Sequence, residues 1–484
     1  MAGYGAIVIK GASETPVYVA VHGDKVYFRD ASALWGIESC FTVGRILREA
    51  EPGSGMRTIM RIGLAGERGV TYATLVTETY RHFGRLGLGA VFGSKRLKAL
   101  VVSGRRSLPV GDHGLYRKLY ERLWQEAVAS SAMRKYHDLG TAENVLPLND
   151  LGGLPTRNLR QAHFEGAEGI SGERLAGGFL GRRLACAHCP TGCIHIAALR
   201  EPYEDEPYFY KTTMISYDYE PLYALGSMLG IGEAQGFLKL LDRVETWGLD
   251  AISTGVVLAW ATEAQQRGLI TEKDTAGVRL SWGDYRAYMK AVEYILRQPT
   301  DLYRAMAKGV EEAARVFGGE DFALAFGRNE MPGYHTGPCA HIGHLIGARH
   351  SHLDGAGYSL DQKWPKDKPL TPKAVVEELV KEEGWRQVLS SLVVCFFARG
   401  IYKPSVVPEL LSIVGYRIDE RGLLGLGREI LKRKMRFKFR EGFSFKDLRI
   451  PRRIFETPTP HGMLQEGFLR EALRCAEELY RLDL

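Results

Sequence analysis

The chain has 484 residues, of which 45% are hydrophobic and 25% charged; this composition is typical of globular proteins, and the length suffices for about two to four domains. No stretch approaches the roughly 20 apolar residues of a membrane-spanning helix, and no secretory signal is visible at the start. A net charge of +7 is too small to indicate nucleic-acid binding, and seven cysteines are too few for a disulfide scaffold. We therefore expect a cytoplasmic protein without nucleic-acid or membrane partners.

The N-terminal part of the chain has the pattern of a small β-rich region. Pro16–His22 and Lys25–Arg29 alternate between polar and apolar residues and flank Gly23-Asp24, which predicts a two-residue hairpin with a type II′ turn. Further strands are expected at Ala6–Lys10, Arg57–Leu64 and Leu97–Ser103. A helix is expected at Thr71–Phe83, because that segment contains neither glycine nor proline.

Helical spacing dominates the remainder of the chain. The clearest predicted helices are Leu115–Ala129, Gly232–Trp247, Thr254–Gln266, Tyr285–Arg297, Pro372–Glu383 and Gly467–Leu482. Trp247–Gly255 is typical of one helix that ends before a glycine and a second helix opened by Asp or Ser. The chain has four asparagines, and such scarcity is typical of thermophilic proteins.

Three cysteines lie at C-x2-C-x3-C spacing, at Cys186, Cys189 and Cys193. Short loops let the three thiolates converge on one centre, which favours a [4Fe–4S] cluster, with zinc or three unligated cysteines as alternatives. The fourth ligand of a cluster is a distant cysteine, and spacing alone does not choose among the candidates Cys40, Cys339, Cys395 and Cys475.

The glycine-rich segment Gly84–Lys95 invites comparison with phosphate-binding loops. It is not a Walker A motif, because no lysine directly follows the second glycine, and it is not a good dinucleotide fingerprint, because a helix is expected where a strand is required. Two interpretations remain: backbone N–H groups that approach an anionic ligand, with Arg85 and Lys95 supplying charge, or an ordinary glycine turn.

Five of the thirteen histidines lie within a short segment: His335, His341, His344, His350 and His352. Arg349 and Asp354 lie in the same stretch, so the groups needed for proton transfer and anion binding occur together, although buried structural histidines are the alternative. Asp218 and Glu220 precede a predicted helix at Leu222–Leu229. The basic run Lys432–Arg440 is interpreted as a solvated face or a docking patch for an acidic protein.

Taken together, these segments resemble the aldehyde ferredoxin oxidoreductase family of tungsten enzymes over essentially the whole chain. The resemblance is carried by the C-x2-C-x3-C motif and by segments that occur in family order: AGYGAIVIKGASETPVYV (Ala2–Val19), GRLGLGAVFGSKRLKALVV (Gly84–Val102), YEPLYALGSMLGI (Tyr219–Ile231), WGLDAISTG (Trp247–Gly255), EMPGY (Glu330–Tyr334) and SLVVCFF (Ser391–Phe397).

The resemblance implies two cofactors. One is a [4Fe–4S] cluster whose fourth ligand is Cys395, beside Phe396. The other is a tungsten, sometimes molybdenum, bis-pyranopterin that has no protein ligand to the metal. The pterin-contacting residues implied by the match are Arg85, Leu86, Gly87, Leu88, Leu249 and Asp250, with Glu245 at a position where the family's aldehyde enzymes carry Asp, and Arg349 as a further candidate.

The resemblance also implies the catalytic groups. Glu220 matches the carboxylate near the metal that orients or deprotonates water, and His352 is the better match to the active-site histidine, with His350 as its rival. The spelling R-H-S-H-L-D around them departs from that of the aldehyde enzymes. The implied reaction is oxidation of an aldehyde to a carboxylic acid, with ferredoxin as electron acceptor.

We therefore predict an α+β protein with three domains: a β-rich pterin-binding domain at residues 1–109, a helical domain with the cysteines at 110–325 and a C-terminal helical domain at 326–484. The family carries strands and pterin ligands before the segment that starts this chain, so Ala6–Lys10 is expected to be an interior strand of a domain that lacks its first half. A homodimer is possible. The alternatives are a tungsten subunit for another substrate, a truncated non-catalytic iron–sulfur relative and a zinc-stapled helical protein.

Overall fold

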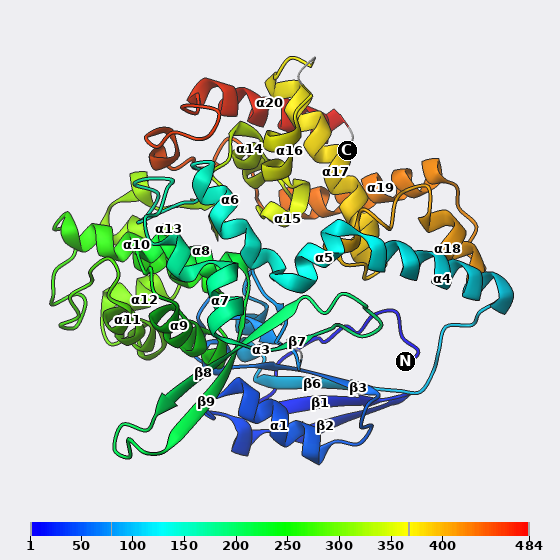
Figure 1. The fold of residues 1–484 in the computed structure, drawn as a ribbon, viewed down its shortest axis with the longest axis horizontal. Helices are drawn as coiled ribbons and strands as arrows, with labels where there is room; N and C mark the ends of the chain where they lie inside the picture. Colours follow the sequence, from blue (N-terminus) through cyan, green and yellow to red (C-terminus); the bar gives the residue numbers. More distant parts are fainter. Residues whose placement is uncertain (1, 79, 366–367, 483–484) are drawn as a thin grey trace.

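The computed structural model describes residues 2–78, 80–365 and 368–482, and it has an α+β fold (Figure 1). A six-stranded sheet is formed by the N-terminal part of the chain, and most of the remainder is helical, which confirms the predicted fold class. The strands are β1 (Val17–His22), β2 (Lys25–Asp30), β3 (Arg57–Ile62), β4 (Leu75–Val76), β5 (His82–Phe83) and β6 (Leu97–Ser103), in the order β2-β1-β6-β3-β4-β5.

The predicted hairpin is confirmed. His22 pairs with Lys25, so the turn has two residues, and Gly23 has a φ of 63° whereas Asp24 has no positive φ, as a type II′ turn requires. The two faces of the sheet bury different residues, because side chains alternate along a strand. Tyr18 and Ala20 pack with α1 (Cys40–Ala50) on one face. Val19 and Val21 pack on the other face with Phe92 of α3 (Leu88–Ser94).

Two N-terminal expectations are wrong. The expected helix at Thr71–Phe83 contains instead the short strands β4 and β5, which pair with each other, while Tyr72 to Val76 are all buried, so no helix face is left for solvent. The expected strand at Ala6–Lys10 pairs with no described strand, and Val8 is 78% exposed. The apolar sequence of Ala6–Lys10 predicts a buried strand, but most of these residues are exposed.

The second part of the chain surrounds one fully buried helix, α10 (Ala251–Gln266), whose residues from Ala251 to Ala264 are all buried. Helix α9 (Ala234–Trp247), which precedes α10, has fourteen residues. Gly248 follows it in a left-handed conformation, so the helix ends before a glycine, as the sequence predicts. The helices of this part are α4 (His113–Ala129), α5 (Ser131–Asp138), α6 (Val145–Asp150), α7 (Gly172–Gly178), α8 (Tyr219–Leu225), α9 (Ala234–Trp247), α10, α11 (Tyr285–Arg297), α12 (Asp301–Met306) and α13 (Val310–Phe317).

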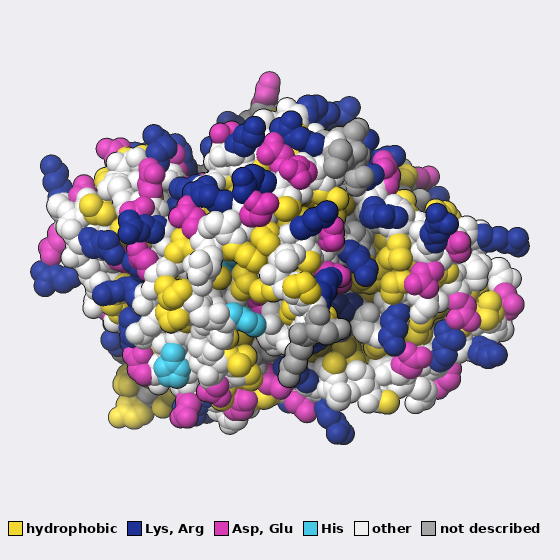
Figure 2. Space-filling view, turned by 90° about the horizontal axis from the view of Figure 1, so that it is seen from above, with side chains coloured by type: hydrophobic (Ala, Val, Ile, Leu, Met, Phe, Trp, Pro, Cys, Tyr) yellow, Lys and Arg dark blue, Asp and Glu magenta, His cyan; other side chains and the backbone are white. Residues whose placement is uncertain are grey.

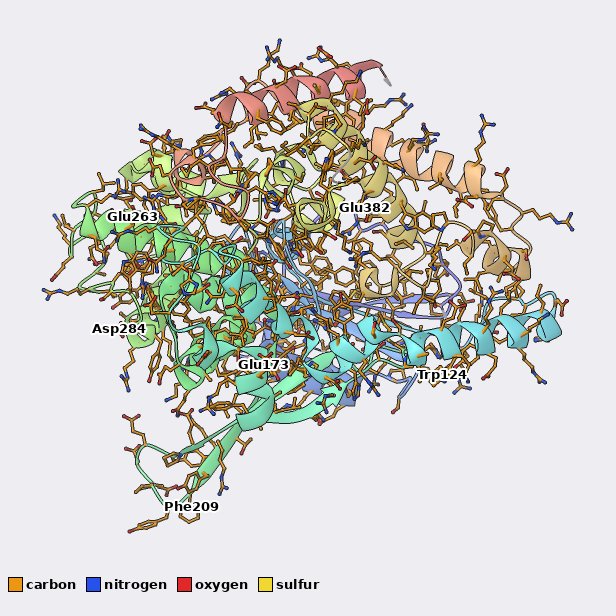
Figure 3. The ribbon with its side chains drawn as sticks, turned by 45° about the horizontal axis from the view of Figure 1, so that its top comes forward. Trp124, Glu173, Phe209, Glu263, Asp284 and Glu382 are labelled. Carbon is orange, nitrogen blue, oxygen red and sulfur yellow. The ribbon has the colours of Figure 1, made fainter. Side chains whose placement is uncertain are left out.

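A three-stranded antiparallel sheet in this part was not predicted. It consists of β7 (Leu180–Leu184), β8 (Ile194–Pro202) and β9 (Tyr210–Tyr217) and carries the C-x2-C-x3-C segment between β7 and β8. The β8–β9 hairpin projects from the body of the molecule, with Phe209 at its tip (Figures 1 and 3). The predicted helix at Leu222–Leu229 starts earlier, at Tyr219, so Glu220 lies in the first turn of α8 rather than before it.

The C-terminal part packs against the same core. It contains β10 (Ala325–Phe326), β11 (Asn329–Glu330), α14 (Pro338–Ile346), α15 (His352–Gly355), α16 (Gly357–Lys363), α17 (Pro372–Ser391), α18 (Val407–Ile413), α19 (Glu420–Arg440) and α20 (Glu466–Leu482). The six helices that the sequence predicts most clearly all occur in the structure, although α17 continues beyond the predicted end at Glu383.

The basic run Lys432–Arg440 lies on α19 and is not a uniformly solvated face. Lys434 donates to Gln387 Oε1 at 2.5 Å, and Lys438 lies 2.8 Å from His350 Nε2, so these two lysines point into the protein.

Basic and acidic side chains are interspersed over the face seen in Figure 2. Among the described residues, no helix is long and apolar enough to cross a membrane.

A buried ion pair joins the C-terminal segment to the central helix. Arg453 Nη2 lies 2.6 Å from Glu263 Oε1, and Asn158 donates to the other carboxylate oxygen at 2.8 Å. Burial raises the pKa of Glu263, but Arg453, Asn158 and Arg267 outweigh that effect, and the pKa of Glu263 is lowered.

We predict that Arg453→Met destabilises the fold by about 1–3 kcal/mol, because the buried Glu263 carboxylate loses its buried cation and keeps only Asn158 and the half-exposed Arg267. The pair contributes stability above the pKa of an unfolded glutamate, and that contribution is lost as the pH falls, so the deficit of the variant shrinks in acid. Chemical denaturation at several pH values measures this, with the exposed Arg452→Met as control. Equal stability of the two variants at pH 7 would contradict the assignment.

Candidate active site

A cavity of about 300 Å³ lies where the N-terminal sheet, α8, α10 and α15 meet. Six of the predicted site residues line it: Arg85, Glu220, Glu245, Leu249, Asp250 and His352. The residues that line the cavity without having been predicted as site residues include Thr74, Arg81, His82, Asp218, Tyr219, Tyr334, Tyr358 and Phe397. The structure thus brings together residues from both ends of the chain.

The glycine loop places Arg85 in this cavity. Gly87 has a φ of 73°, and a Cβ atom there would collide with the carbonyl oxygen of Thr71, so only glycine lets the loop lie on that carbonyl. Leu86 also has a positive φ and is 56% exposed, outside the cavity lining. Leu88 begins α3 and packs beneath the sheet. Of the four predicted loop residues, only Arg85 therefore reaches the cavity.

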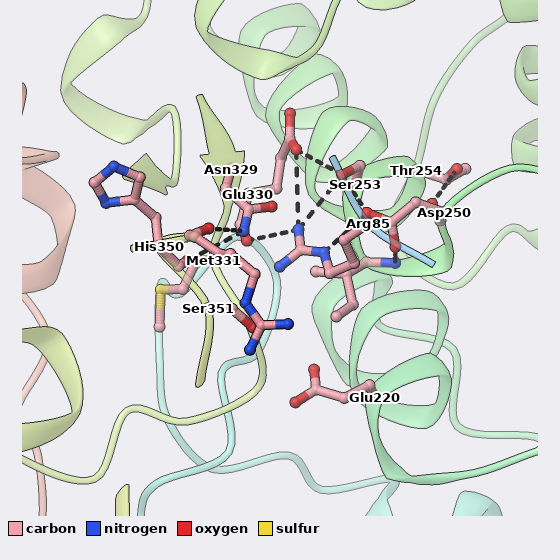
Figure 4. Close-up of polar contacts among 12 residues, drawn as sticks. Arg85, Glu220, Asp250, Ser253, Thr254, Asn329, Glu330, Met331, His350 and Ser351 are labelled. Carbon is pink, nitrogen blue, oxygen red and sulfur yellow. Dashed lines mark hydrogen bonds and ion pairs between the residues drawn. The ribbon is translucent and has the colours of Figure 1, made fainter. Parts of the chain in front are cut away.

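Arg85 of the glycine loop binds both the start of α10 and the segment at Glu330 (Figure 4). Its Nε donates to Asp250 Oδ2 at 2.9 Å, and its Nη2 donates to the carbonyl oxygen of Glu330 at 2.8 Å. Asp250 also caps α10 by accepting from the N–H of Ile252. Ser253 Oγ lies 2.6 Å from Asp250 Oδ2 and 2.5 Å from Glu330 Oε2.

A serine hydroxyl has one proton and cannot donate to two carboxylates, so one of these two acids is protonated. Burial raises the pKa of Glu330, which makes Glu330 the neutral partner.

Glu220 and His352 face each other across the cavity. Glu220 Oε1 lies 3.5 Å from His352 Nε2, and Glu220 Oε2 accepts from the N–H of Gly333 at 3.1 Å. Burial raises the pKa of Glu220 to about 8, although the Gly333 N–H and Arg85 oppose this. Burial lowers the pKa of His352 well below its usual value, and repulsion from His344 lowers it further. At neutral pH the pair is therefore a carboxylic acid beside a neutral imidazole, and the pKa of Glu220, about 8, is close enough to neutral for a general base.

The structure separates the two rival histidines. His350 lies outside the cavity lining: its Nδ1 donates to the carbonyl oxygen of His344 at 2.9 Å, and its Nε2 faces Lys438. Figure 4 shows its ring turned away from Glu220 and Arg85. Arg349 pairs with Asp354 at 2.8 Å and is not in the lining either. Of the two histidines, His352 alone reaches the cavity.

Several buried polar atoms of the lining residues have no hydrogen-bond partner among the residues that the structure describes. They are Thr74 Oγ1, Arg85 Nη1, Glu220 Oε1 and His352 Nδ1. Buried donors and acceptors are nearly always satisfied, so this set indicates a bound group that offers both donors and acceptors. His82 and Glu245 form a further pair, with His82 Nε2 2.8 Å from Glu245 Oε2. Burial alone would lower the pKa of His82, but the attraction of the Glu245 carboxylate is stronger and raises it.

The four predicted cluster ligands are near enough to act on one another electrostatically. Burial raises the pKa of the Cys193 thiol to about 11; Arg81 opposes this, and Cys395, Cys186 and Cys189 add to it. Arg81 relates the two sites, because it lines the cavity and Cys193 and Cys186 both act electrostatically on it.

The remaining cysteines lie elsewhere. Cys40 and Cys339 are buried in other contacts, and Cys475 lies on α20. No group of His, Cys, Asp or Glu among the described residues is arranged around a single metal ion. A cubane differs, because each thiolate binds its own iron.

Phe397 lines the cavity, and Phe396, expected beside the cluster, does not. Phe397 stacks on Tyr136 with ring centroids 4.4 Å apart, whereas Phe396 packs beneath the guanidinium of Arg386. Arg81 and His82 were missed because they fall in the segment expected to be helical. In the sequence, Tyr334 stands out only as the last residue of the EMPGY segment. In the structure its ring lies 5.4 Å from that of His352 and 4.1 Å from that of Tyr358. Aromatic residues in a sequence give no sign of which of them face a cavity.

Comparison with known families agrees with this fold. Residues 1–104 match the model of the aldehyde ferredoxin oxidoreductase N-terminal domain, and residues 116–483 match that of domains 2 and 3 of the same enzyme. The chain therefore belongs to the aldehyde ferredoxin oxidoreductase family, a family of oxidoreductases.

Individual relatives extend the comparison. A tungsten-containing aldehyde ferredoxin oxidoreductase of Thermococcus kodakarensis is 31% identical over 478 residues, which cover 95% of this chain and 76% of the relative. The WOR-like subunit of an aliphatic sulfonate oxidoreductase of Pyrococcus furiosus is 30% identical over 65% of this chain and 50% of its own length. The BamBC active-site complex of benzoyl coenzyme A reductase shares the fold, with a TM-score of 0.77 at 18% identity over 97% of this chain and 78% of that one.

We predict that Gly87→Ala destabilises the protein by about 1–3 kcal/mol, because the new Cβ meets the Thr71 carbonyl at a strained φ. Gly84→Ala in the same loop is the matched control, since its Cβ would meet nothing closer than 3.8 Å. Thermal unfolding of both variants measures the difference. Equal melting temperatures would show that the loop does not depend on the left-handed glycine.

Proposed function

We propose that this protein oxidises an aldehyde to a carboxylic acid and passes the electrons to ferredoxin. One arrangement carries the proposal: a cavity that holds the Glu220–His352 pair and several unpaired polar atoms directly adjoins a group of four cysteines, with Arg81 in between. A redox enzyme needs both a place for substrate chemistry and an exit for electrons, and this arrangement supplies both.

The residues present fit a tungsten or molybdenum bis-pyranopterin in the cavity and a [4Fe–4S] cluster at Cys186, Cys189, Cys193 and Cys395. Pterins carry hydrogen-bond donors and acceptors along one edge, and Thr74 Oγ1, Arg85 Nη1 and the Asp250 carboxylate offer complementary groups. When bound, the metal cofactor accepts the electron pair of the substrate and the cluster passes electrons on singly. Leu249 and Glu245 would line the pterin site.

The part played by the protein's own residues is proton transfer. Oxidation of an aldehyde with water yields a carboxylic acid, two protons and two electrons, and a base near the reacting carbon must take up a proton. Glu220 is the base in this proposal, and His352 is the neighbouring imidazole that shares the proton. The tyrosines around the pair, Tyr219 and Tyr334, exclude water from it. The electrons leave through the cysteine group, where Cys186 and Cys395 are exposed to a partner.

A second candidate is oxidation of another substrate class, because the sulfonate oxidoreductase subunit is 30% identical over the 65% of this chain that it matches, against 31% over 95% for the aldehyde enzyme of Thermococcus kodakarensis. Arg81 and Arg85 line the cavity and suit an anionic substrate. Assays of viologen reduction with aliphatic and aromatic aldehydes, beside alkyl sulfonates, separate the two candidates. Activity with aldehydes alone supports the first proposal, and activity with sulfonates alone replaces it.

The metal content tests the cofactors. We predict tungsten together with about four irons per chain in protein purified without oxygen. Cys395→Ser is expected to lose most of the iron, whereas Cys475→Ser, on α20, keeps it. Elemental analysis by plasma mass spectrometry provides the measurement. Iron without tungsten or molybdenum would indicate a non-catalytic relative, and zinc in place of iron would indicate a structural site.

The pH dependence of turnover tests Glu220. Because the base form is the carboxylate and burial raises the pKa of Glu220 to about 8, kcat/KM is expected to increase as the pH rises through about 8. Glu220→Gln is expected to lower turnover about a hundredfold or more without loss of tungsten, while Glu173→Gln at an exposed position changes neither. An unchanged rate in Glu220→Gln would remove Glu220 from the mechanism.

A further inference from the structure

The imidazole of His352 is not held in the cavity by hydrogen bonds of its own. Its Nδ1 has no partner among the described residues, and its Nε2 lies 3.5 Å from Glu220 Oε1, an atom that also has no hydrogen-bond partner there. The rings of Tyr334 and Tyr358 lie 5.4 and 6.4 Å away. Contacts between ring faces have little directionality, so the place of this imidazole depends on the backbone that carries it.

That backbone is the segment of residues 347–354, which we call the His352 turn. His352 is the first residue of α15, Ser351 caps this helix, and His350 before them has a φ of 53°. A left-handed φ in a residue other than glycine costs free energy and persists only where surrounding contacts fix it. The side chains that bind the turn therefore decide where the imidazole lies.

The N–H groups of the His352 turn are bound by two buried carboxylates. Asp354 Oδ2 accepts from the N–H groups of Arg349 and Ser351, at 2.9 and 3.1 Å. Glu383 Oε1, on α17, accepts from the N–H of Ala348 at 3.0 Å. Both carboxylates are at most 1% exposed, so the bonds are shielded from water. The donors of the turn are thus satisfied from one side.

The carbonyl groups of the turn are bound by Asn329, which lies on β11 and is 2% exposed. Its Nδ2 donates to the carbonyl oxygens of Arg349 and His350, at 2.9 and 3.1 Å (Figure 4). Both partners only accept, so the amide must present its NH2 group, and each hydrogen serves one carbonyl. These carbonyls belong to the two peptide groups that flank the Cα of His350. One side chain therefore fixes both backbone dihedrals of the strained residue.

The strand that carries this amide also binds the other side of the cavity. The carbonyl oxygen of Glu330, the second residue of β11, accepts from Arg85 Nη2 at 2.8 Å. The turn before the strand lies directly against the His352 turn, because a Cβ atom at Gly327 would collide with the imidazole of His350. Strand β11 thus places the guanidinium and the His352 turn in one frame.

We propose that Asn329 is a positioning residue whose amide fixes the backbone at His350 and thereby holds the imidazole of His352 in the cavity. Asn329 is not among the residues that line the cavity, so it acts on the reaction through His352 and not by contact with a substrate. The inference rests on the proposed function only in taking turnover as one of its two readouts.

The variant that removes both donors is Asn329→Leu, which keeps the volume of the side chain. The two carbonyls of the His352 turn lose their donor, so the backbone at His350 is expected to change its dihedrals. A crystal structure of the variant is expected to show His352 displaced by about 1 Å or more from its place opposite Glu220, a shift large enough to affect the reaction. An unmoved turn would overturn the proposal.

Turnover provides a second readout. In Asn329→Leu, kcat is expected to fall about ten- to a hundredfold while KM changes little, because the catalytic group is misplaced and the cavity lining is intact. In a His352→Ala background, Asn329→Leu is expected to lower kcat no further, since the group that it positions is gone. A residue with a purely structural role would lower kcat in both backgrounds, and that result would overturn the proposal. If His352→Ala has no measurable turnover, the crystal structure decides.

The matched control is Asn149→Leu, the same substitution at another buried asparagine. Asn149 Oδ1 accepts from the N–H of Phe164 at 2.6 Å, far along the chain from the turn. The control is expected to lose thermal stability but to keep kcat, and equal losses of kcat in the two variants would contradict the proposal. If Asn329→Leu does not fold, Asn329→Ser, which cannot serve both carbonyls, replaces it, and a wild-type kcat in that variant would overturn the inference. A displaced turn in a protein that oxidises neither aldehydes nor sulfonates would instead overturn the proposed function and support the positioning role.

Discussion

The guanidinium of Arg85 is the contact on which the active-site arrangement depends. It extends from the glycine loop next to the N-terminal sheet and binds Asp250 at the start of α10 and the backbone of Glu330 before α14. Those three positions belong to three different parts of the chain; Asp250 and Glu330 are buried, and the side chain of Arg85 is 14% exposed. Because a buried guanidinium needs paired acceptors, the loop, the helix start and the later segment are held in one geometry. The spare Nη1 of Arg85 then remains for a ligand.

Burial acts on the acid and the imidazole of the cavity in opposite senses. It raises the pKa of Glu220 and lowers that of His352, so both are neutral together, whereas a solvated pair at the same distance would form an ion pair. The proton of this pair therefore rests on Glu220. The buried acid and imidazole of the cavity thus differ from the cysteine group beyond Arg81, where Cys186 and Cys395 are exposed.

The sequence predicts much of this fold where local rules decide the structure. The Gly23-Asp24 hairpin, the cap of α10 by Asp250 and the helix at Tyr285–Arg297 follow from turn, capping and periodicity rules. The segment Thr71–Phe83 fails because its short strands form only through pairing with β3 and each other. Ala6–Lys10 fails because an apolar sequence does not by itself supply a partner strand. Cys395 was identified by family resemblance, since spacing alone cannot bring it to residues so far away in sequence.

Anomalous diffraction from crystals of the anaerobically purified protein tests the central claim most directly, because it places each metal in the structure. Data collected at the tungsten and iron edges are predicted to show a tungsten peak in the cavity beside Glu220 and His352. A compact group of iron peaks is predicted among Cys186, Cys189, Cys193 and Cys395. A cavity without tungsten or molybdenum in active protein, or iron bound away from these cysteines, would contradict the account.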